Sequence, residues 1–403
     1  MRVLLACVLS VFVCWTVSAR TVNVRDAGAK GDGVADDSAA IQSVLNSKER
    51  PLDVWIPDGD YRIVKTLKVS SDTTIRAAAH ARIFLCGETP HRRDDFLLDN
   101  ADHEQGNANI SLEGGIWDGN NQGRLNKKES NIFKQDAWSG VTMNFRNVRK
   151  LKLRDMTLAN SVTYNIRMCQ LYDFEIRDIR FFSEHKAYNQ DGLHVNGFVF
   201  NGVVENIRAV SKGQTNDDLL ALNADDSMAR LENFGMTCGP IENIVFRNIF
   251  AEDCHTAVRF LSVISPIRNI RVENLVSGIR CYSINADGAR YCRTPLFRDE
   301  DRPQGVGLLE NIVIDGFTTW ATKKDRNPLI CLETNLRNFT LKNMTRDLAK
   351  DSAPERDFLQ IRKTAGVRLS GNDAQGNAQQ CEIGERENRV FHDAFSTLIL
   401  NER

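Results

Sequence analysis

The feature of this sequence that most limits its fold is a repeated, strand-like segment with Asn or Asp near its ends. Within each copy, apolar and polar residues alternate, so one set of side chains faces inward and the other outward. Adjacent copies begin about 23 to 45 residues apart, which is the spacing of a solenoid repeat or a small multiple of it. The copies begin at Asn147, Leu171, Glu205, Ile241, Ile267, Leu309 and Leu336.

A unit of this kind cannot bury its own apolar face and has to stack on its neighbours. The sequence therefore predicts an all-β chain folded as a right-handed parallel β-helix. Asn tolerates the left-handed backbone of a corner, and stacked Asn side chains can satisfy each other's hydrogen bonds. A β-sandwich is the alternative, but its hairpins need tighter turns and shorter repeats.

Two segments depart from the repeat. Residues 36–45 have apolar side chains at helical spacing, and we expect a short helix there, capped by Asp36 or Asp37. This helix would cover the open N-terminal end of the stack. Residues 350–403 lack the repeat and are expected to form a C-terminal cap or extension.

The N-terminus has the pattern of a secretory signal peptide. Arg2 is followed by an apolar run from Val3 to Val17 and then by the small pair Ser18-Ala19. The run is short for a bilayer span, although a membrane anchor or a buried strand is the alternative. We expect residues 1–19 to be a signal peptide and residues 20–403 to form one β-helix domain. The mature chain would then be secreted or periplasmic, without a membrane span.

Charge and cysteine content exclude some functions. The formal net charge is -1, so the chain lacks the basic field that nucleic acid or an anionic membrane would require. None of the ten cysteines lies in a C-x-x-C pair, so neither a zinc site nor another cofactor is indicated. Export would permit disulfides, and the spacing leaves open whether the eight cysteines after residue 19 are paired or remain buried thiols.

Five short motifs, in a consistent order, carry a resemblance to a known family. They are Gly114-Gly-Ile-Trp-Asp-Gly, Asn189-Gln-Asp-Gly, Asn216-Asp-Asp, Cys254-His-Thr and Gly278-Ile-Arg-Cys-Tyr. They are similar to G-x-I-D-G, N-T-D-G, G-D-D, G-H-G and G-x-R-I-K of glycoside hydrolase family 28, the polygalacturonases and their relatives. The opening from Val22 to Gln42 also resembles pectinase-like β-helix proteins in general. The resemblance extends over roughly residues 22 to 345.

The chain departs from the family pattern at several motif positions. Gln190 stands for Thr, Asn216 for Gly, Thr256 for the second Gly of G-H-G, and Tyr282 for the Lys of R-I-K. In the family this Lys helps to hold the sugar carboxylate, and Tyr cannot supply the same charge. Arg259 is the candidate to supply it from the adjacent coil. The identity of the sugar therefore stays open.

Hydrolysis of a glycosidic bond needs a protonated carboxyl group and a carboxylate, with room for a water in an inverting enzyme. Adjacent coils lie about 4.8 Å apart, so acids on neighbouring coils can supply both groups. The resemblance implies two sets of residues. The catalytic set is Asp217 as general acid, Asp191 and Asp218 to position and deprotonate the water, and His255 to orient or tune the acid; the substrate-binding set is Arg280, Tyr282, Arg259 and Asn189.

Other polar residues are assigned no role. Strand alternation places His194 on the opposite face from Asp191. The vicinal acids Asp94-Asp95 and Asp225-Asp226 are expected to be solvated turns.

The sequence thus favours an inverting, polygalacturonase-like glycosidase acting on a pectic or related polysaccharide, as a monomer without a metal or cofactor. Two alternatives stay open. One is a polysaccharide lyase on the same fold, with the three acids binding Ca²⁺ and Arg280 or His255 as the base. The other is a carbohydrate-binding β-helix without turnover.

Overall fold

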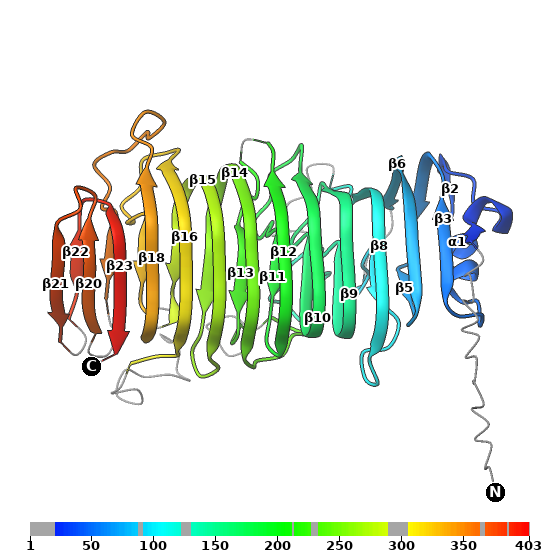
Figure 1. Cartoon of the computed structure of the whole chain (residues 1–403). Coiled ribbons are helices and arrows are strands. Elements are labelled where there is room, and N and C mark those ends of the chain that lie inside the picture. The colour runs from blue at the N-terminus through cyan, green and yellow to red at the C-terminus, as the bar shows by residue number, and fades with distance from the viewer. Residues whose placement is uncertain are drawn as a thin grey trace, which may run out of the picture.

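The chain is described by a computed structural model that covers residues 21–87, 92–121, 130–211, 213–226, 233–288, 305–362, 367–384 and 387–402. These residues form strands side by side in a long stack, from the N-terminal end to the C-terminal end (Figure 1). The expected signal peptide lies outside the described residues. Within the described part, no helix is both long and apolar enough to cross a membrane.

The strands of the first half begin next to a short 3-10 helix, Val24–Ala27, and an α-helix, α1, Ser38–Leu45. They are β1 Thr21–Asn23, β2 Asp32–Asp36, β3 Leu52–Ile56, β4 Gly59–Ile63, β5 Leu67–Val69, β6 Thr73–Leu85, β7 Leu98–Asn100, β8 Asn107–Asp118, β9 Met143–Ala159, β10 Ile166–Phe182, β11 Leu193–Val195 and β12 Val199–Ala209.

The second half continues the stack and ends in shorter strands. These are β13 Asp218–Asn223, β14 Ile241–Leu261, β15 Ile267–Ala286, β16 Leu309–Ala321, β17 Ile330–Leu332, β18 Leu336–Arg346, β19 Leu359–Ile361, β20 Val367–Asp373, β21 Ala378–Ile383, β22 Arg389–Phe391 and β23 Phe395–Glu402. The seven repeats recognised in the sequence fall within β9, β10, β12, β14, β15, β16 and β18.

A turn here means one coil of the chain in the stack. The strands of successive turns pair in parallel and in register, so equivalent apolar residues stack in columns. One column runs through eight strands: Leu112, Leu153, Ile176, Val204, Phe246, Val272, Ile314 and Leu341. All of these side chains are buried within one continuous apolar cluster. The predicted all-β chain of stacked parallel strands is therefore confirmed.

Asparagines at the corners join the turns to one another. Asn206, Asn248 and Asn274 all adopt left-handed backbone, with φ of 57°, 56° and 55°. The side-chain amide of Asn248 donates to Asn206 over 3.0 Å and accepts from Asn274 over 2.9 Å. A second row runs from Asp173 through Asn201, Asn243, Asn269 and Asn311 to Asn338. The expected stacking of asparagines is therefore present, and it fixes the register at two corners.

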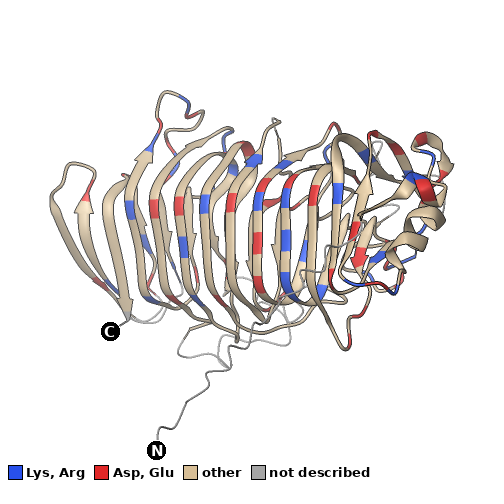
Figure 2. Ribbon diagram, turned by 45° about the vertical axis from the view of Figure 1, so that its right-hand side comes forward, with Lys and Arg blue, Asp and Glu red and all other residues tan. Residues whose placement is uncertain are grey.

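Many charged side chains on the outer face of the strands pair with an opposite charge on the adjacent turn. Glu205 lies between Arg177 and Arg247, and Arg247 also contacts Glu273 over 2.7 Å. Figure 2 marks the positions of Lys and Arg in blue and those of Asp and Glu in red along neighbouring strands. Such exposed pairs add little stability individually, but like charges on adjacent rungs would oppose stacking.

The two ends of the stack differ from its middle. At the N-terminal end, α1 covers β3 and β5 with its buried residues Ile41, Val44 and Leu45 (Figure 1). Asp37 occupies the N-cap position, but its carboxylate accepts hydrogen bonds from the backbone of Lys30 and Gly31 instead of capping the helix. At the C-terminal end, β23 pairs antiparallel with β18 and β20, so the parallel stacking stops there.

Two variants of Asn248 separate the contribution of its side-chain hydrogen bonds from that of its left-handed backbone. Ala loses both amide hydrogen bonds and is strained at φ of 56°, so we expect Asn248→Ala to lower the free energy of unfolding by about 3 kcal/mol. Asn248→Gly loses the same bonds without that strain and should cost about 1 kcal/mol less. Denaturant unfolding of both variants measures this difference. Equal losses would show that the left-handed backbone is not the constraint.

Candidate functional site

The candidate catalytic residues come from three successive turns. Asp191 lies two residues before β11, and Asp218 is the first residue of β13, with Asp217 directly before it. His255 lies in β14, and Arg280 lies in β15. Each residue is therefore placed where a strand begins or bends, close to the parallel backbone pairing that sets its position.

The strand register brings two of the acids to equivalent positions. Leu193 pairs with Leu220, and the backbone amide of Gly192 donates to the carbonyl oxygen of Asp218 over 2.9 Å. Asp191 and Asp218 are therefore neighbours on adjacent turns, about 4.8 Å apart along the stack. This agrees with the position expected from the sequence.

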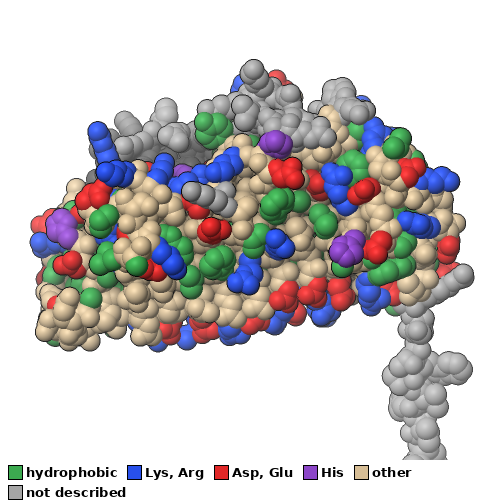
Figure 3. Space-filling model, turned by 90° about the horizontal axis from the view of Figure 1, so that it is seen from above, with side chains coloured by type: hydrophobic (Ala, Val, Ile, Leu, Met, Phe, Trp, Pro, Cys, Tyr) green, Lys and Arg blue, Asp and Glu red, His purple; other side chains and the backbone are tan. Residues whose placement is uncertain are grey.

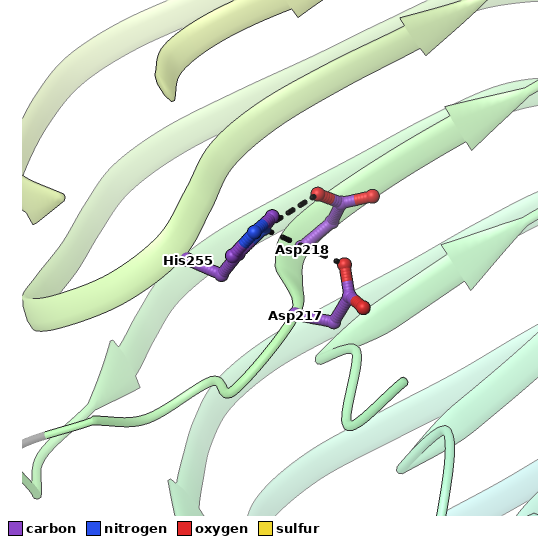
Figure 4. A group of neighbouring side chains, drawn as sticks. All are labelled: Asp217, Asp218 and His255. Atoms are coloured by element: carbon purple, nitrogen blue, oxygen red, sulfur yellow. Dashed lines mark ion pairs between the residues drawn. The ribbon is translucent and has the colours of Figure 1, made fainter. Parts of the chain in front are cut away.

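Asp217, Asp218 and His255 form a cluster around one imidazole. The Nδ1 atom of His255 lies 3.7 Å from Oδ1 of Asp217 and 4.0 Å from Oδ1 of Asp218 (Figure 4). The side chain of Asp217 is 28% exposed, whereas that of Asp218 is only 4% exposed. Asp217 is thus the carboxyl group that solvent or a bound molecule can reach more easily.

Arg259 lies between two buried carboxylates. Its guanidinium is 3.4 Å from Oδ2 of Asp218 and 3.3 Å from Oδ2 of Asp287. The arginine is only 11% exposed. The positive charge of Arg259 therefore acts directly on Asp218. Only a small part of the Arg259 side chain is accessible to a sugar carboxylate.

Arg280 holds the loop that precedes the acid pair. Its guanidinium donates to the side-chain oxygen of Asn216 over 2.5 Å and to the backbone oxygen of Thr215 over 2.9 Å. The amide of Asn216 in turn donates to the backbone of Ala187 over 2.6 Å. The Asn that replaces the family Gly therefore has a structural function here, because it links Arg280 to the neighbouring turn.

The remaining motif residues are placed as follows. Tyr282 is 4% exposed and lies in register with Thr256. Asn189 adopts left-handed backbone with φ of 59° and is partly exposed. Gln190 is buried, and its amide donates to the backbone oxygens of Ser161 and His185. The Gln that replaces the family Thr therefore anchors the turn that carries Asp191.

The expectation that His194 points away from Asp191 is wrong. The Nδ1 atom of His194 lies 2.5 Å from Oδ2 of Asp191, and both side chains are buried. Alternation of side chains holds only within a strand. Asp191 lies in the loop before β11, so the alternation within β11 does not predict its direction.

The expectation that Asp225 and Asp226 form a solvated turn is also wrong. Both are buried. One carboxylate oxygen of Asp225 accepts backbone amides of residues 263, 264 and 265 at 2.7 to 2.8 Å. Oδ2 of Asp226 lies 3.0 Å from Nε2 of His194. No sequence motif marks this pair, because its partners come from other turns.

The two adjacent acids have pKa values shifted in opposite directions. Burial and the nearby charge of Asp218 raise the pKa of Asp217 to about 6. Burial would also raise the pKa of Asp218, but His255 and Arg259 outweigh it and lower that pKa. Near neutral pH, Asp218 is therefore ionised while Asp217 retains a proton more readily. Such a split is typical of acid and base pairs in active sites.

The histidines and the third acid also have shifted pKa values. Burial disfavours the charged form of His255, but Asp218 and Asp217 outweigh this and raise its pKa to about 10. His194 follows the same pattern, because Asp191 and Asp226 raise its pKa to about 9 despite burial. Burial, with the charges of Asp217 and Asp218, raises the pKa of Asp191.

The cluster also has the composition of a cation site. One donor atom each from Asp217, Asp218 and His255 lie within 4.8 Å of one another. Oxygen ligands suit Ca²⁺, but a protonated His255 and the guanidinium of Arg259 already supply positive charge at this point. The charges of these residues therefore fit an acid–base pair better than a binding site for Ca²⁺.

The face seen in Figure 3 carries basic, acidic and hydrophobic side chains intermixed, and its described residues form no continuous basic area.

Four of the described cysteines, Cys86, Cys169, Cys254 and Cys331, are buried. Cys292, the candidate to close a loop with Cys281, lies outside the described residues, so cysteine pairing stays open.

This fold and this arrangement of acids define a class of proteins. The family model described as rhamnogalacturonase A/epimerase, pectate lyase-like, matches residues 21–280, which is more than half of the chain. The chain belongs to this family, and it is a pectin lyase-fold protein like those of glycoside hydrolase family 28. The resemblance stated from the motifs is confirmed.

Individual relatives are distant. A polygalacturonase of Prunus persica is 23% identical over 317 residues, which are 73% of this chain and 72% of that protein. The preneck appendage protein of Bacillus phage PZA is 32% identical over 111 residues, but these are 28% of this chain and only 12% of the phage protein. The family 28 exopolygalacturonase of Yersinia enterocolitica has the same fold, with a TM-score of 0.54, 16% identity, and coverage of 82% of this chain and 72% of that chain.

The buried His194 should make stability depend on pH. Its pKa is raised in the folded state to about 9, from 6.5, so its stabilising charge is fully present below pH 6.5 and is lost as the pH rises through 9. We expect the free energy of unfolding to fall more steeply between pH 7 and about 9.5 in the parent protein than in His194→Gln. Denaturant unfolding at several pH values measures the two slopes, and identical slopes would contradict a charged His194.

Proposed function

We propose that this protein is an inverting glycoside hydrolase that cleaves a pectic or related polysaccharide. The observation that supports this most directly is the pair Asp217 and Asp218, whose pKa values are split, with Asp191 at the equivalent position of the next turn. The family and the polygalacturonase relatives support the same class of reaction.

Asp217 is the general acid in this proposal. Its raised pKa keeps a proton available in mildly acidic solution, and it is more exposed than Asp218. It gives this proton to the glycosidic oxygen as the bond to the leaving sugar breaks. His255, close to both acids, stabilises the charge that remains on Asp217.

The attacking water is held from the opposite side of the bond. Asp217 and Asp218 have carboxylate oxygens within 4.8 Å of each other, which is less than the 6.5 to 9.5 Å of an inverting pair. Asp191, one turn away, can provide the longer separation. We therefore assign Asp191 as the base and Asp218 as the carboxylate that helps to orient the water.

Substrate binding is assigned to the remaining motif residues. Arg280 and Arg259 supply the positive charge for a uronate carboxylate or for hydroxyl groups near the cleavage point, and Asn189 and Tyr282 complete the proposed set. Both arginines already contact acidic or amide partners. A substrate group would therefore share these guanidinium groups with the protein, which favours weak or partial recognition of acidic sugars over strict recognition of galacturonate.

The proposal includes the chain's organisation. The stack is a right-handed β-helix closed at its N-terminal end by α1, and the protein acts as a secreted or periplasmic monomer without a cofactor. The alternative function is a lyase, which would require the cluster of Asp217, Asp218 and His255 to bind Ca²⁺. A lyase would produce an unsaturated sugar that absorbs near-ultraviolet light, and a chelator would abolish its activity.

The first test is removal of the acid. Asp217→Asn should reduce kcat on a responsive polysaccharide by about 10²- to 10⁴-fold, because general acid catalysis is lost. Reducing-end release from a panel of plant and algal polysaccharides measures activity, and NMR of the first product shows whether the anomeric configuration inverts. Asp94→Asn, at an exposed position, is the matched control and should retain activity.

Several outcomes would reject the proposal. Full activity in Asp217→Asn would remove Asp217 as the acid, and an unsaturated product would identify a lyase. Binding of a polysaccharide without any product, in the parent and the variant alike, would indicate a binding protein.

The second test uses pH. Activity should fall as the pH rises above about 6, because Asp217 must be protonated. The charge of Asp218 helps to raise that pKa, so Asp218→Asn should move this alkaline limb to lower pH, besides lowering kcat. Measurement of kcat/KM from pH 4 to 8 in both proteins checks this shift. An alkaline limb that stays in place would contradict the coupling of the two acids.

A further inference from the structure

Asp191 belongs to a chain of three buried side chains that the sequence motifs do not include. Nδ1 of His194 is 2.5 Å from Oδ2 of Asp191, and Nε2 of the same ring is 3.0 Å from Oδ2 of Asp226. The three side chains are between 1% and 4% exposed. Two carboxylates thus flank one imidazole, so both ring nitrogens donate when the ring is protonated.

The ring of His194 is fixed on its face as well as at its edges. Tyr164 stacks on it, with ring centroids 3.8 Å apart and planes within 8° of each other. The amide of Asn233 donates to Oδ2 of Asp226 over 2.9 Å and lies 3.3 Å from the hydroxyl of Tyr164. These contacts leave the imidazole one orientation, with Nδ1 toward Asp191.

The carboxylate of Asp191 uses only one oxygen in this chain. Its Oδ2 atom faces His194, whereas its Oδ1 atom is buried and has no hydrogen-bond partner among the described residues. A buried carboxylate oxygen without a partner is costly, and an ordered water can satisfy it. Asp191 therefore has one oxygen held in place and one oxygen ready for a water.

We propose that His194, oriented by Asp226, is a positioning residue that favours the ionised form of Asp191 and aims its free Oδ1 at the attacking water. This inference rests on the proposed hydrolytic function. In the reaction, an O–H bond of the water breaks and its proton moves to Oδ1 of Asp191. The water oxygen bonds to the anomeric carbon, the glycosidic C–O bond breaks, and Asp217 gives its proton to the leaving oxygen.

The charges around the ring explain why this arrangement is needed. Burial and the charges of Asp217 and Asp218 raise the pKa of Asp191, and the contact with His194 opposes this rise. Asp226 has its pKa lowered to about 2, because His194 and Arg259 outweigh its burial, so it remains a carboxylate that favours the imidazolium. Six groups surround the His194 ring. Asp191, Asp226 and Asn233 lie near its nitrogen atoms, and Tyr164 stacks on its face. Arg167 of β10 is in register with His194, and Arg259 of β14 acts on Asp226.

The test replaces the imidazole by a neutral donor. Gln at position 194 can still donate to Asp191 but carries no charge. Because the base must be ionised, the acidic limb of kcat/KM should move to higher pH in His194→Gln, and kcat at pH 5 should fall by about 10- to 100-fold. KM should change less than about twofold, because His194 does not touch the substrate. His80→Gln, at an exposed position of β6, is the matched control and should leave the profile unchanged.

A second variant and a second readout keep the test decisive. Asp226→Asn removes the charge that favours the imidazolium while retaining the shape of the side chain. NMR of isotope-labelled histidine should show both ring nitrogens of His194 protonated at pH 7.5 in the parent protein, and only one in Asp226→Asn. The resonance is assigned by its absence from His194→Gln or, if that variant does not fold, by its through-space contacts with the ring of Tyr164, which stacks on His194.

The two proposals can fail separately. If the parent hydrolyses a polysaccharide but the acidic limb of His194→Gln or Asp226→Asn does not move, His194 has only a structural role and the inference is overturned. If His194 is neutral at pH 7.5 in the parent, the inference is also overturned. If no polysaccharide is cleaved while His194 is charged and depends on Asp226, the hydrolase proposal fails and the charged pair remains.

Discussion

Parallel backbone pairing between consecutive turns is the constraint on which the rest of this molecule depends. It fixes the distance between turns, so a residue at a given place in one turn always meets its equivalent in the next. The asparagine corners make this pairing regular, because a left-handed residue bends the chain and its amide binds the corner above and below. An apolar core, a charged outer face and a group of neighbouring acids can then each form from residues at equivalent positions of successive turns.

The candidate site uses this regularity and then departs from it. Asp191 and Asp218 are equivalent residues of adjacent turns, so their proximity follows from register alone. Their different electrostatic surroundings do not follow from register. Asp218 lies beside the guanidinium of Arg259, whereas Asp191 lies beside an imidazole that another carboxylate holds. Two identical side chains at equivalent positions therefore have pKa values shifted in opposite directions.

The strands, the corners and the positions of the motif acids could be predicted from the sequence, because alternation and Asn spacing are local signals that the stacking preserves. The partners of those acids could not. Alternation fails to predict the contact of His194 with Asp191, because it holds within β11 and not in the loop before that strand. It also gives no sign that Asp226 is buried, because the partners of Asp226 are distant in the sequence. Local patterns thus predict which residues lie on a turn, whereas contacts between side chains of different turns require the structure.

The reversal of chain direction at β23 has a consequence for how copies of this molecule meet. A solenoid that ended on a parallel strand would offer the next molecule a template on which its first strand could continue the same pairing, and filaments would grow end to end. Here the final layer runs antiparallel to β18, and its outermost strand, β21, presents the polar and acidic side chains of Gln379, Gln380 and Glu382. The terminal layer thus offers another copy a polar, antiparallel edge in place of the parallel template that would continue the stack.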